Sequence, residues 1–468
     1  MVFSSQLFLY GFLPVFFALY FLIHDRRKNW LILTASLIFY AVGAGSTVIV
    51  LLASIWLNQF LAVRIAPASQ PWRVRLLALG IALNLLGLGY YKYVSFLWRL
   101  LGDGFAAFAL PPLPAAPEIP LPVGISFFTF QAISYLIDVY RREIPPASGY
   151  GEFAVYHSLF PQLVAGPIVR FSEIRLEMDD RKVDRMALSE GGYRFCLGLG
   201  KKMVVADNLG VVVDAIFALP PNELSWEHAW VGILCYSLQI YFDFSGYSDM
   251  AIGLGRVLGF HFPENFDQPY RSATITEFWR RWHMTLSRWF RDYLYIPLGG
   301  NRHGTLRTFA NLWIVFFLCG LWHGAGLTFI VWGLYHGTLL VAERYAHRRW
   351  RPAGVAALGA TFILVSIGWV FFRAPTLAVA WDYLAAMFLL GLPISDYRPL
   401  AAYLQHDTLA YLALGVFFAF TPLEQFYKLR FDRPAMLAAQ IGLASLCLVY
   451  SMLLLAANSF NPFIYFRF

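Results

Sequence analysis

Long apolar runs separated by short polar stretches extend over almost the whole chain. A helix needs about 20 mainly apolar residues to cross the hydrocarbon core of a membrane. Runs that approach this length occupy residues 6–23, 30–44, 47–63, 76–95, 121–140, 228–257, 309–322, 326–343, 354–373, 408–424 and 435–457. The pattern predicts an all-α integral membrane protein with about 10 or 11 transmembrane helices.

Three more apolar stretches are interrupted by Gly, Pro or charged residues; they cover residues 152–168, 190–217 and 377–392. Interrupted backbone at membrane depth is tolerated only where it is buried in protein or lines a water-filled cavity. We therefore expect these stretches to be re-entrant helices, or helices that lie along the membrane interface.

The composition supports a membrane protein rather than a soluble one. Charged residues make up only 14% of the chain and hydrophobic residues 59%, whereas soluble domains carry about a quarter charged residues. The net charge of +8 comes from Lys and Arg that gather in the polar stretches between apolar runs. This distribution is typical of cytoplasmic loops, so we expect membrane lipid, and not nucleic acid, as the partner of these charges.

The basic clusters also predict the orientation of the spans, because positively charged loops remain in the cytoplasm. The first cluster, residues 26–28, follows the first apolar run and places the N-terminus outside. We expect this run to be a retained span, since a cleaved signal peptide carries its charges before the apolar stretch. The later clusters fall on the same side if residues 377–392 do not cross, which places the C-terminus outside as well.

A stretch that interleaves Trp and Arg occupies residues 271–302. Ser272 or Thr274 can cap a helix here, and Glu277 can help to close it. At helical spacing one face of this helix holds Phe278, Trp282, Thr285 and Trp289. On or near a second face lie Arg280, His283, Ser287 and Arg291. The pattern predicts an amphipathic interfacial helix, whose arginines serve either as a lipid anchor or in binding.

His323 lies between two strongly apolar flanks, in the sequence Trp322-His323-Gly324. Ionisable groups at such a position are costly and usually face the interior of a helix bundle or a water-filled cavity. The nearby glycines, Gly324 and Gly326, let another chain or a ligand approach the backbone closely. A catalytic histidine and a buried histidine with one structural hydrogen bond are both consistent with this pattern.

A third polar group lies inside the apolar run 228–257 and comprises Asp243, Ser245, Ser248 and Asp249. Carboxylates and hydroxyls in such a run must be paired or hydrated. They can orient a histidine, hold a polar substrate or satisfy broken helix ends, and a purely structural role remains open.

Metal and nucleotide chemistry find little support in the sequence. His283, His323, His336 and Asp243 could in principle hold a metal, but no HExxH or other short ligand pair exists, so we expect no metal site. The four cysteines stand singly and indicate no disulfide framework. The chain also lacks a P-loop and a GxSxG motif, which argues against nucleotidases and serine hydrolases.

Five motifs in the middle of the chain give it a family resemblance. They are PVGISFFTF at 122–130, FPQLVAGP at 160–167, DFSGYSD at 243–249, PENF at 263–266 and the stretch 278–300. With His323 in its Trp-His-Gly context, this ordered set resembles the membrane-bound O-acyltransferase (MBOAT) superfamily, and in particular its bacterial alginate O-acetyltransferase branch.

The resemblance implies a ring of helices around a thin central funnel, with the histidine at its constriction. We expect a single polytopic membrane domain over residues 1–468. Its expected parts are N-terminal helices (1–119), an MBOAT catalytic core (120–345), C-terminal helices (346–457) and a periplasmic tail rich in Phe and Tyr (458–468).

The resemblance also implies the activity, that of an acyltransferase and more narrowly an O-acetyltransferase. The acetyl group would come from a cytoplasmic donor, acetyl-coenzyme A, which is a substrate, with no bound cofactor. It would cross the inner membrane of a bacterial cell to an exopolysaccharide such as alginate or cellulose. Implied partners are a periplasmic SGNH-hydrolase-like acetyltransferase and an exopolysaccharide synthesis complex.

By motif position, His323 matches the essential histidine of the family and His283 matches its second histidine. We expect His323 to act as general base toward a hydroxyl, and His283 to orient or polarise the carbonyl of the donor. The candidates for donor binding and for the pocket are Arg280, Arg281, Arg288, Arg291, Asp243, Ser245 and Ser248.

The C-terminal sequence, FIYFRF at 463–468, carries a second resemblance. It is similar to the tail of a small companion peptide in teichoic-acid D-alanylation, whose tyrosine is implicated as an acyl carrier. The resemblance implies that Tyr465 takes the acetyl group and passes it outward. An ordinary aromatic belt at the membrane edge is the alternative.

Two other classes of function stay open from the sequence. Intramembrane histidines and carboxylates also occur in transporters or channels for polar solutes, although no internal repeat of the kind found in transporters is present. A scaffold for a secretion complex, with structural histidines, is the other alternative.

Overall fold

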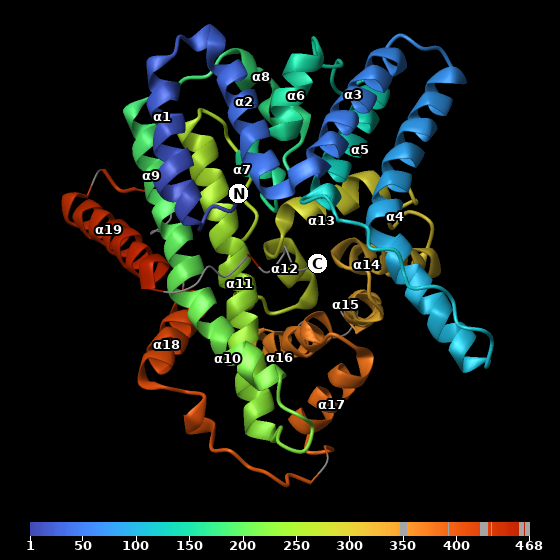
Figure 1. The fold of residues 1–468 in the computed structure, drawn as a ribbon, viewed down its shortest axis with the longest axis vertical. Coiled ribbons are helices and arrows are strands. Elements are labelled where there is room, and N and C mark those ends of the chain that lie inside the picture. Colours follow the sequence, from blue (N-terminus) through green and yellow to red (C-terminus); the bar gives the residue numbers. More distant parts are fainter. Residues whose placement is uncertain (347–352, 392, 422–428, 432, 458–462, 464–468) are drawn as a thin grey trace. The chain divides into compact units, whose positions relative to one another are not determined.

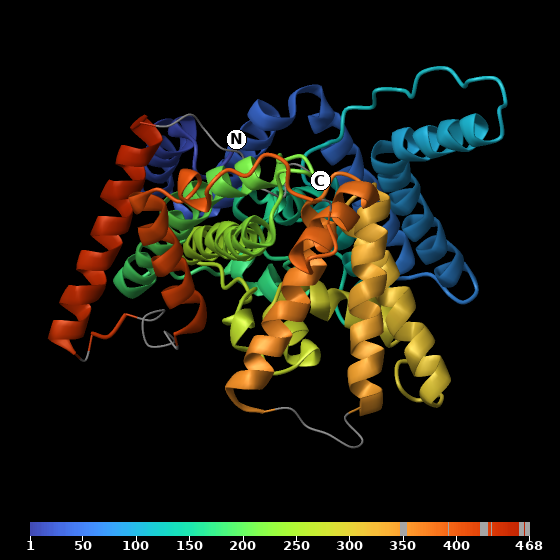
Figure 2. The same ribbon diagram turned by 90° about the horizontal axis from the view of Figure 1, so that it is seen from below.

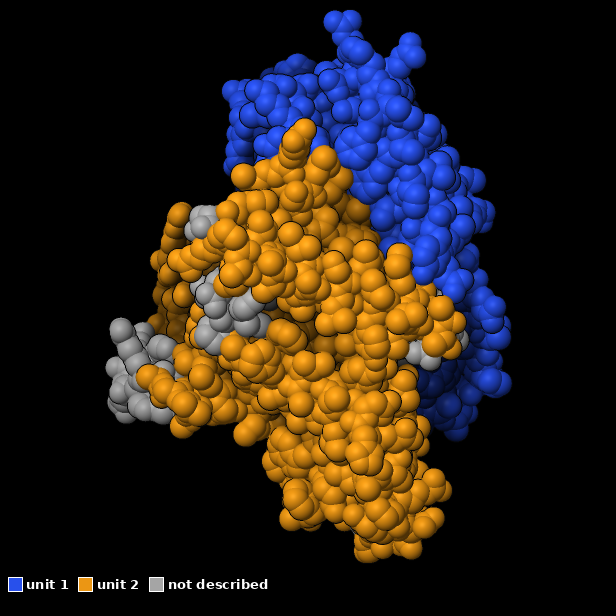
Figure 3. Space-filling model, turned by 90° about the vertical axis from the view of Figure 1, so that its left-hand side faces the viewer, with its two compact units in different colours: residues 1–184, 258–263 blue, residues 185–257, 264–468 orange. Residues whose placement is uncertain are grey.

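The structure is a computed structural model that describes residues 1–346, 353–391, 393–421, 429–431, 433–457 and 463. All regular secondary structure in these residues is helical. The chain divides into two compact units, which Figure 3 colours separately: unit 1 holds residues 1–184 and 258–263, and unit 2 holds residues 185–257 and 264–468.

Unit 1 is built from helices that mostly run antiparallel to their sequence neighbours (Figure 1). In chain order these are η1 (Leu7–Phe12), α1 (Leu13–Leu22), α2 (Asp25–Ala44), η2 (Gly45–Thr47), α3 (Val48–Ile65), α4 (Trp72–Ala107), α5 (Ile125–Arg141), α6 (Tyr150–Ser158), α7 (Phe160–Leu163) and α8 (Phe171–Asp179). Residues 110–122, between α4 and α5, form the long irregular loop that Figure 2 shows.

Aromatic rings and paired amides stabilise the interior of unit 1. The ring of Phe160 lies between 5.2 and 5.6 Å from the rings of Phe12, Phe16 and Phe39. Asn58 of α3 and Asn84 of α4 exchange hydrogen bonds of 3.2 and 2.7 Å. Reciprocal amide bonds of this kind satisfy polar groups that the apolar interior cannot hydrate.

Unit 2 is larger and contains the predicted site residues. Its elements are α9 (Arg185–Gly200), η3 (Lys201–Ala206), α10 (Asp207–Phe217), α11 (Trp226–Val257), η4 (Pro269–Arg271), α12 (Ile275–Arg281), α13 (Met284–Phe290), η5 (Arg291–Tyr295), α14 (Thr305–His323), α15 (Leu327–Ala346), α16 (Gly354–Arg373), α17 (Leu377–Met387), η6 (Leu400–Ala402), α18 (His406–Phe420) and α19 (Pro434–Ala457). Figures 1 and 2 show α11 passing through the middle of this unit.

The prediction of an all-α membrane protein is confirmed, and each predicted span overlaps helical structure in the residues that are described. By length and composition, five helical stretches in the described residues can cross a membrane: 25–65, α4, α14, α16 and α19. Shorter apolar helices occupy 7–22, α17 and α18. The total of about ten or eleven crossings stays a prediction.

Helix α11 differs from a lipid-facing span, because residues 235–251 are buried without interruption. A helix that is buried on all sides is the core of its unit, and its apolar composition reflects contact with protein. The stretch 152–168 is indeed interrupted, as α6 and α7. The stretch 190–217, in contrast, is one continuous helical run in which η3 is a π-helical turn.

Glycines bring the backbones of α9 and α11 into direct contact. A Cβ atom added to Gly198 would lie 2.5 Å from the carbonyl oxygen of Gly246, and one added to Gly253 would lie 2.6 Å from that of Gly191. Both distances are below any normal carbon–oxygen contact, so a side chain cannot be accommodated without moving a helix. This close approach positions the polar residues of η3 against α11.

Replacing Gly198 by Leu is therefore expected to separate α9 from α11. The free energy of unfolding should fall by at least about 1–3 kcal/mol, the usual effect of overpacking a close-packed site. Gly192→Ala in the same helix is the matched control, because its Cβ meets nothing within 4 Å. Thermal unfolding of both variants in detergent measures the difference, and equal midpoints would contradict the close packing.

Candidate active site

His283 stands at a break between two short helices, α12 and α13. Its backbone is left-handed, with φ 42° and ψ 55°, a conformation that costs a residue with a side chain about 1–3 kcal/mol. The segment 265–267 holds the break in place: the Asp267 amide donates to the Arg281 carbonyl, and the Met284 amide donates to the Asn265 carbonyl, both at 2.9 Å.

This break corrects the prediction of one amphipathic helix over 271–302, because helical periodicity does not continue through residue 283. The predicted helix start is confirmed. The hydroxyl of Thr274 accepts a hydrogen bond from the Glu277 amide at 3.0 Å, and the Glu277 carboxylate accepts one from the Ala273 amide at 2.9 Å. Pairing with a distant loop, which local sequence does not encode, ends the helix.

The side chain of His283 is fully buried and is held by Asn265. Nδ1 of His283 lies 3.0 Å from Oδ1 of Asn265. The same oxygen accepts from the Thr285 amide at 3.3 Å and from the Thr285 hydroxyl at 2.8 Å. The Nδ2 group of Asn265 donates to the hydroxyl of Ser248 at 3.0 Å, so one amide connects the histidine to α11.

His323 is the last residue of α14, and it is 4% exposed. Its ring contacts those of Trp322 and Trp332 at 4.9 Å and that of Phe372 at 5.2 Å. The ring of Trp322 also lies 6.0 Å from that of His283. The two predicted histidines therefore belong to one aromatic layer, with Trp322 in contact with both.

The hairpin of α14 and α15 positions His323 through two more glycines. A Cβ atom on Gly320 would lie 2.3 Å from the Phe329 carbonyl oxygen, and one on Gly333 would lie 2.2 Å from that of Phe316. The helices therefore pack backbone to backbone one turn before His323. The expected close approach at Gly324 is also observed, since its Cβ would overlap the ring of Phe329.

The acidic residues of α11 are paired with cations that the sequence analysis missed. Lys202 lies 2.8 Å from Asp243 and 2.5 Å from Asp207. Asp249 is bound by Lys201 and by Arg194, each at 2.6 Å. For these two carboxylates the geometry favours the structural role that the sequence left open, through ion pairs with η3 and α9.

The sequence did carry a signal for these partners. Arg194, Lys201 and Lys202 are basic residues within the apolar stretch 190–217, and such residues usually pair with acidic groups in the interior. Asn265 likewise lies inside the 263–266 motif. The two serines differ: Ser245 is buried on α11, whereas Ser248 belongs to the surroundings of His283 through Asn265.

Replacing Asp243 by Asn is expected to destabilise the protein strongly. Lys202 is 3% exposed and would keep its charge with one carboxylate instead of two. Removing one partner of a buried ion pair typically costs about 3–5 kcal/mol. The thermal unfolding midpoint is the measurement. Asp214→Asn is the control, since its pair with Arg373 is solvent-exposed and a loss of similar size there would contradict the assignment.

The four candidate arginines have different surroundings. Arg281 lies 3.0 Å from Glu277 and 3.2 Å from Asp267, and Arg291 lies 2.7 Å from Asp292. Arg280 is exposed on α12, and Arg288 is partly buried. Arg280 is thus the best placed of the four to meet a ligand from solvent, and donor binding by this group stays a prediction.

Tyr465 lies outside the described residues, but Phe463 of the same tail is described and is fully buried. The ring of Phe463 lies 4.7 Å from that of Tyr247 and 5.8 Å from that of Phe244. Phe244 in turn lies 4.7 Å from the ring of His283. Phe463 therefore lies one ring away from this histidine.

Two of the residues that were considered as metal ligands, His336 and Asp243, make other contacts in the structure. His336 lies among aromatic rings, 5.2 Å from both Trp279 and Trp332, and Asp243 is bound to Lys202. Within the described residues no group of three or more His, Cys, Asp or Glu is placed to hold a metal ion.

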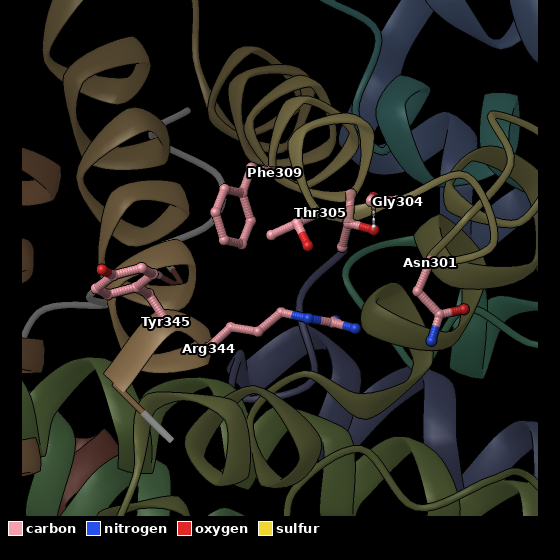
Figure 4. A pocket seen from close by; sticks show the side chains of 7 residues that line it. Asn301, Gly304, Thr305, Phe309, Arg344 and Tyr345 are labelled. Carbon is pink, nitrogen blue, oxygen red and sulfur yellow. Dashed lines mark hydrogen bonds between the residues drawn. The ribbon is translucent and has the colours of Figure 1, made fainter. Parts of the chain in front are cut away.

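A pocket of about 350 Å³ lies at the other end of the α14–α15 hairpin. Figure 4 shows the side chain of Arg344 reaching across it toward Gly304 and Asn301. The hydroxyl of Thr308, which also lines the pocket, donates to the Gly304 carbonyl at 2.9 Å. At about 1.5 Å per residue, the length of α14 separates this end from His323 by about 27 Å. The pocket is therefore not the place where the histidines act.

Comparison with known proteins decides the family. Residues 139–373, which include both histidines and the acidic residues of α11, match the model of MBOAT, the membrane-bound O-acyltransferase family. The chain is also 44% identical, over the full length of both proteins, to the probable alginate O-acetylase AlgI of Pseudomonas putida. The chain belongs to the membrane-bound O-acyltransferase family.

Two further relatives match less of the chain. The peptidoglycan O-acetyltransferase of Helicobacter pylori is 39% identical over 83% of this chain and 80% of its own length. The teichoic acid D-alanyltransferase of Bacillus subtilis is 27% identical over 53% of this chain and 68% of its own. The prediction of an O-acetyltransferase in a multi-pass membrane protein is thus confirmed, ahead of the transporter and scaffold alternatives.

Proposed function

We propose that this O-acetyltransferase takes acetyl from acetyl-coenzyme A on the cytoplasmic side and transfers it across the inner membrane of a bacterial cell. The observation that carries the proposal is the pair of buried histidines in one aromatic layer, His283 and His323, joined by Trp322. Both termini lie on the periplasmic side in this proposal, as the basic clusters predict.

The acceptor that we propose is alginate, reached through a periplasmic SGNH-hydrolase-like partner in an exopolysaccharide synthesis complex. Support comes from the relatives named alginate O-acetylase, which match the whole chain. Cellulose and peptidoglycan are the competing acceptors, and a relative that covers most of this chain is named for peptidoglycan.

The chemistry required is attack of a hydroxyl oxygen on the carbonyl carbon of a thioester. The hydroxyl must lose its proton as the C–O bond forms, and the thiolate leaves as the C–S bond breaks. A positioned histidine that takes this proton contributes about 10²–10⁴ in rate. The apolar rings around His323, those of Trp332 and Phe372, suit the methyl end of an acetyl group and exclude water.

Tyr465 is the hydroxyl that we propose as the first acceptor. Phe463, two residues before it, packs beside Phe244, which contacts His283. Tyr465 follows Phe463 by two residues in the sequence, and this proximity along the chain supports the proposal. A phenol with a pKa near 10 needs a base to become a nucleophile.

The experiment that tests the function is acyl transfer by the purified protein in nanodiscs. Acetyl-coenzyme A labelled in its acetyl group is supplied, and released coenzyme A and label on protein are measured. Oligomers of alginate or peptidoglycan fragments are then added, with and without a periplasmic extract that supplies the partner. Label that passes to alginate supports the proposal, whereas label that passes only to peptidoglycan, or no release of coenzyme A, contradicts it.

A further inference from the structure

The pocket at the end of the α14–α15 hairpin opposite His323 has no part in the proposed acyl transfer. Its volume of about 350 Å³ lies within the range of pockets that bind small molecules. Two separate parts of the chain form it, the stretch 301–309 at the start of α14 and residues 344–345 at the end of α15. A ligand held here would therefore contact both helices of the hairpin.

The two sides of this pocket differ in chemistry. Figure 4 shows the rings of Phe309 and Tyr345 on one side and the amide of Asn301 on the other, with the side chain of Arg344 extending between them. A guanidinium offers five N–H donors in a planar fork that matches a carboxylate or a phosphate. The lining thus suits a molecule that joins an anionic group to an apolar part.

The charge around the pocket is positive. Arg344 is the charged residue among the described residues that line it, and Arg302 and Arg307 are exposed in the same stretch of chain. The neighbouring carboxylate, that of Glu343, accepts a hydrogen bond from the Ile275 amide at 2.6 Å and so serves the start of α12. Within the described residues Arg344 pairs with no carboxylate, which leaves its charge open to an anion.

The pocket lies where α14 passes from polar to apolar sequence. Residues 301–308 are mainly polar, residues 309–322 form an apolar run, and α14 is long and apolar enough to cross a membrane. Leu306, Trp313 and Phe317 are exposed and share one face of this helix at helical spacing. Such an exposed apolar face marks contact with lipid, so the pocket lies at the depth of the lipid headgroups.

We propose that this pocket binds the phosphate of an anionic phospholipid, with its acyl chains along the exposed face of α14. Arg344 provides the charged donors for the phosphate, and the amide of Asn301 provides a further donor. Basic pockets between transmembrane helices bind lipid headgroups in the same way. The apolar face of α14 favours a lipid over a soluble phosphate, because a soluble phosphate has no acyl chain to cover that face.

The bound lipid would fasten the open end of the hairpin that carries His323. Its phosphate would be held by the start of α14 and by the end of α15, whereas Gly320 and Gly333 hold the two backbones together near the histidine. A ligand that binds only the folded protein raises the free energy of unfolding. We therefore expect an anionic phospholipid to raise the thermal unfolding midpoint of the full chain.

The test titrates the purified full chain in detergent micelles with phosphatidylglycerol or phosphatidylcholine. Native mass spectrometry measures lipid binding, and thermal unfolding measures the midpoint. The wild type should bind phosphatidylglycerol more tightly than phosphatidylcholine. Arg344→Gln should weaken phosphatidylglycerol binding at least about fivefold, the effect of one basic residue at a membrane surface. Thr305→Trp keeps every charge and fills the pocket, so it should weaken binding as well.

Arg302→Gln is the matched control, because it removes the same charge from an exposed residue that is not among the described residues lining the pocket. It should leave phosphatidylglycerol binding nearly unchanged. Equal losses in Arg302→Gln and Arg344→Gln would overturn the proposal, since they indicate a general attraction of basic loops to anionic lipid. Wild-type binding by a folded Thr305→Trp would overturn it too, because the lipid would then lie elsewhere.

Inorganic phosphate and coenzyme A are supplied separately to distinguish soluble phosphates from lipid. If either raises the midpoint of the wild type but not of Arg344→Gln, and phosphatidylglycerol does neither, the pocket takes a soluble phosphate and the proposal fails. None of these measurements requires acyl transfer. The proposed function is tested apart from them, by coenzyme A release from acetyl-coenzyme A.

Discussion

Replacing His323 by Ala is expected to lower acetyl transfer by at least about 10²–10⁴, the usual contribution of a positioned acid–base group. The side chain is enclosed by three aromatic rings and stands at the end of a helix that glycines hold against its neighbour. When the imidazole of His323 is removed, neither solvent nor a neighbouring side chain can therefore take over its role. The release of coenzyme A and the label on protein measure the loss.

The control is His303→Ala, because His303 is exposed and lies before α14 rather than at its far end. Thermal unfolding of both variants shows whether the fold survives. A folded His323→Ala protein with wild-type turnover would refute the catalytic assignment and favour a structural histidine. His323→Gln separates chemistry from packing, since it fills most of the space without a titratable ring.

Replacing Tyr465 by Phe is expected to abolish the acetyl label on the protein, because the change removes only the phenol oxygen that would form the ester. Packing should be unaffected, since the ring stays. Mass spectrometry of the C-terminal peptide locates the label in the wild type. A labelled wild-type Tyr465 and an unlabelled variant together establish the relay.

Tyr450→Phe is the matched control, as its hydroxyl pairs with that of Tyr411 on the surface of α18 and α19. It should keep the label at full strength. If Tyr465→Phe still carries a label, or if the wild type releases coenzyme A without any label, the acetyl group passes directly from the donor to the partner protein.

The long apolar helices could be predicted because each is encoded by a long apolar run, which needs no knowledge of distant residues. The same holds for the start of α12, because the capping hydrogen bonds of Thr274 and Glu277 join residues at most four positions apart. His283 and His323 were found because an ionisable residue in apolar surroundings is rare and requires a reason.

What the sequence could not provide is the partner of each polar side chain. Asn265 reaches His283 over 18 residues, and Lys201 reaches Asp249 over 48. Local periodicity has no information at such separations, and the break at His283 arises from the same long-range pairing. Asn265 therefore came into view as a partner of His283 only with the structure, and the role of His283 stays a prediction.

The π-helical turn at Lys201–Ala206 has a consequence for comparing this chain with its relatives. A π turn holds one residue more than an α turn, so it is equivalent to a one-residue insertion in an otherwise regular helix. One residue corresponds to about 100° of rotation about the helix axis. If a relative has a regular α-helix here, an alignment without a gap at this turn would rotate its α10 residues by about 100°, and Asp207 would be matched to a residue that points away from Lys202.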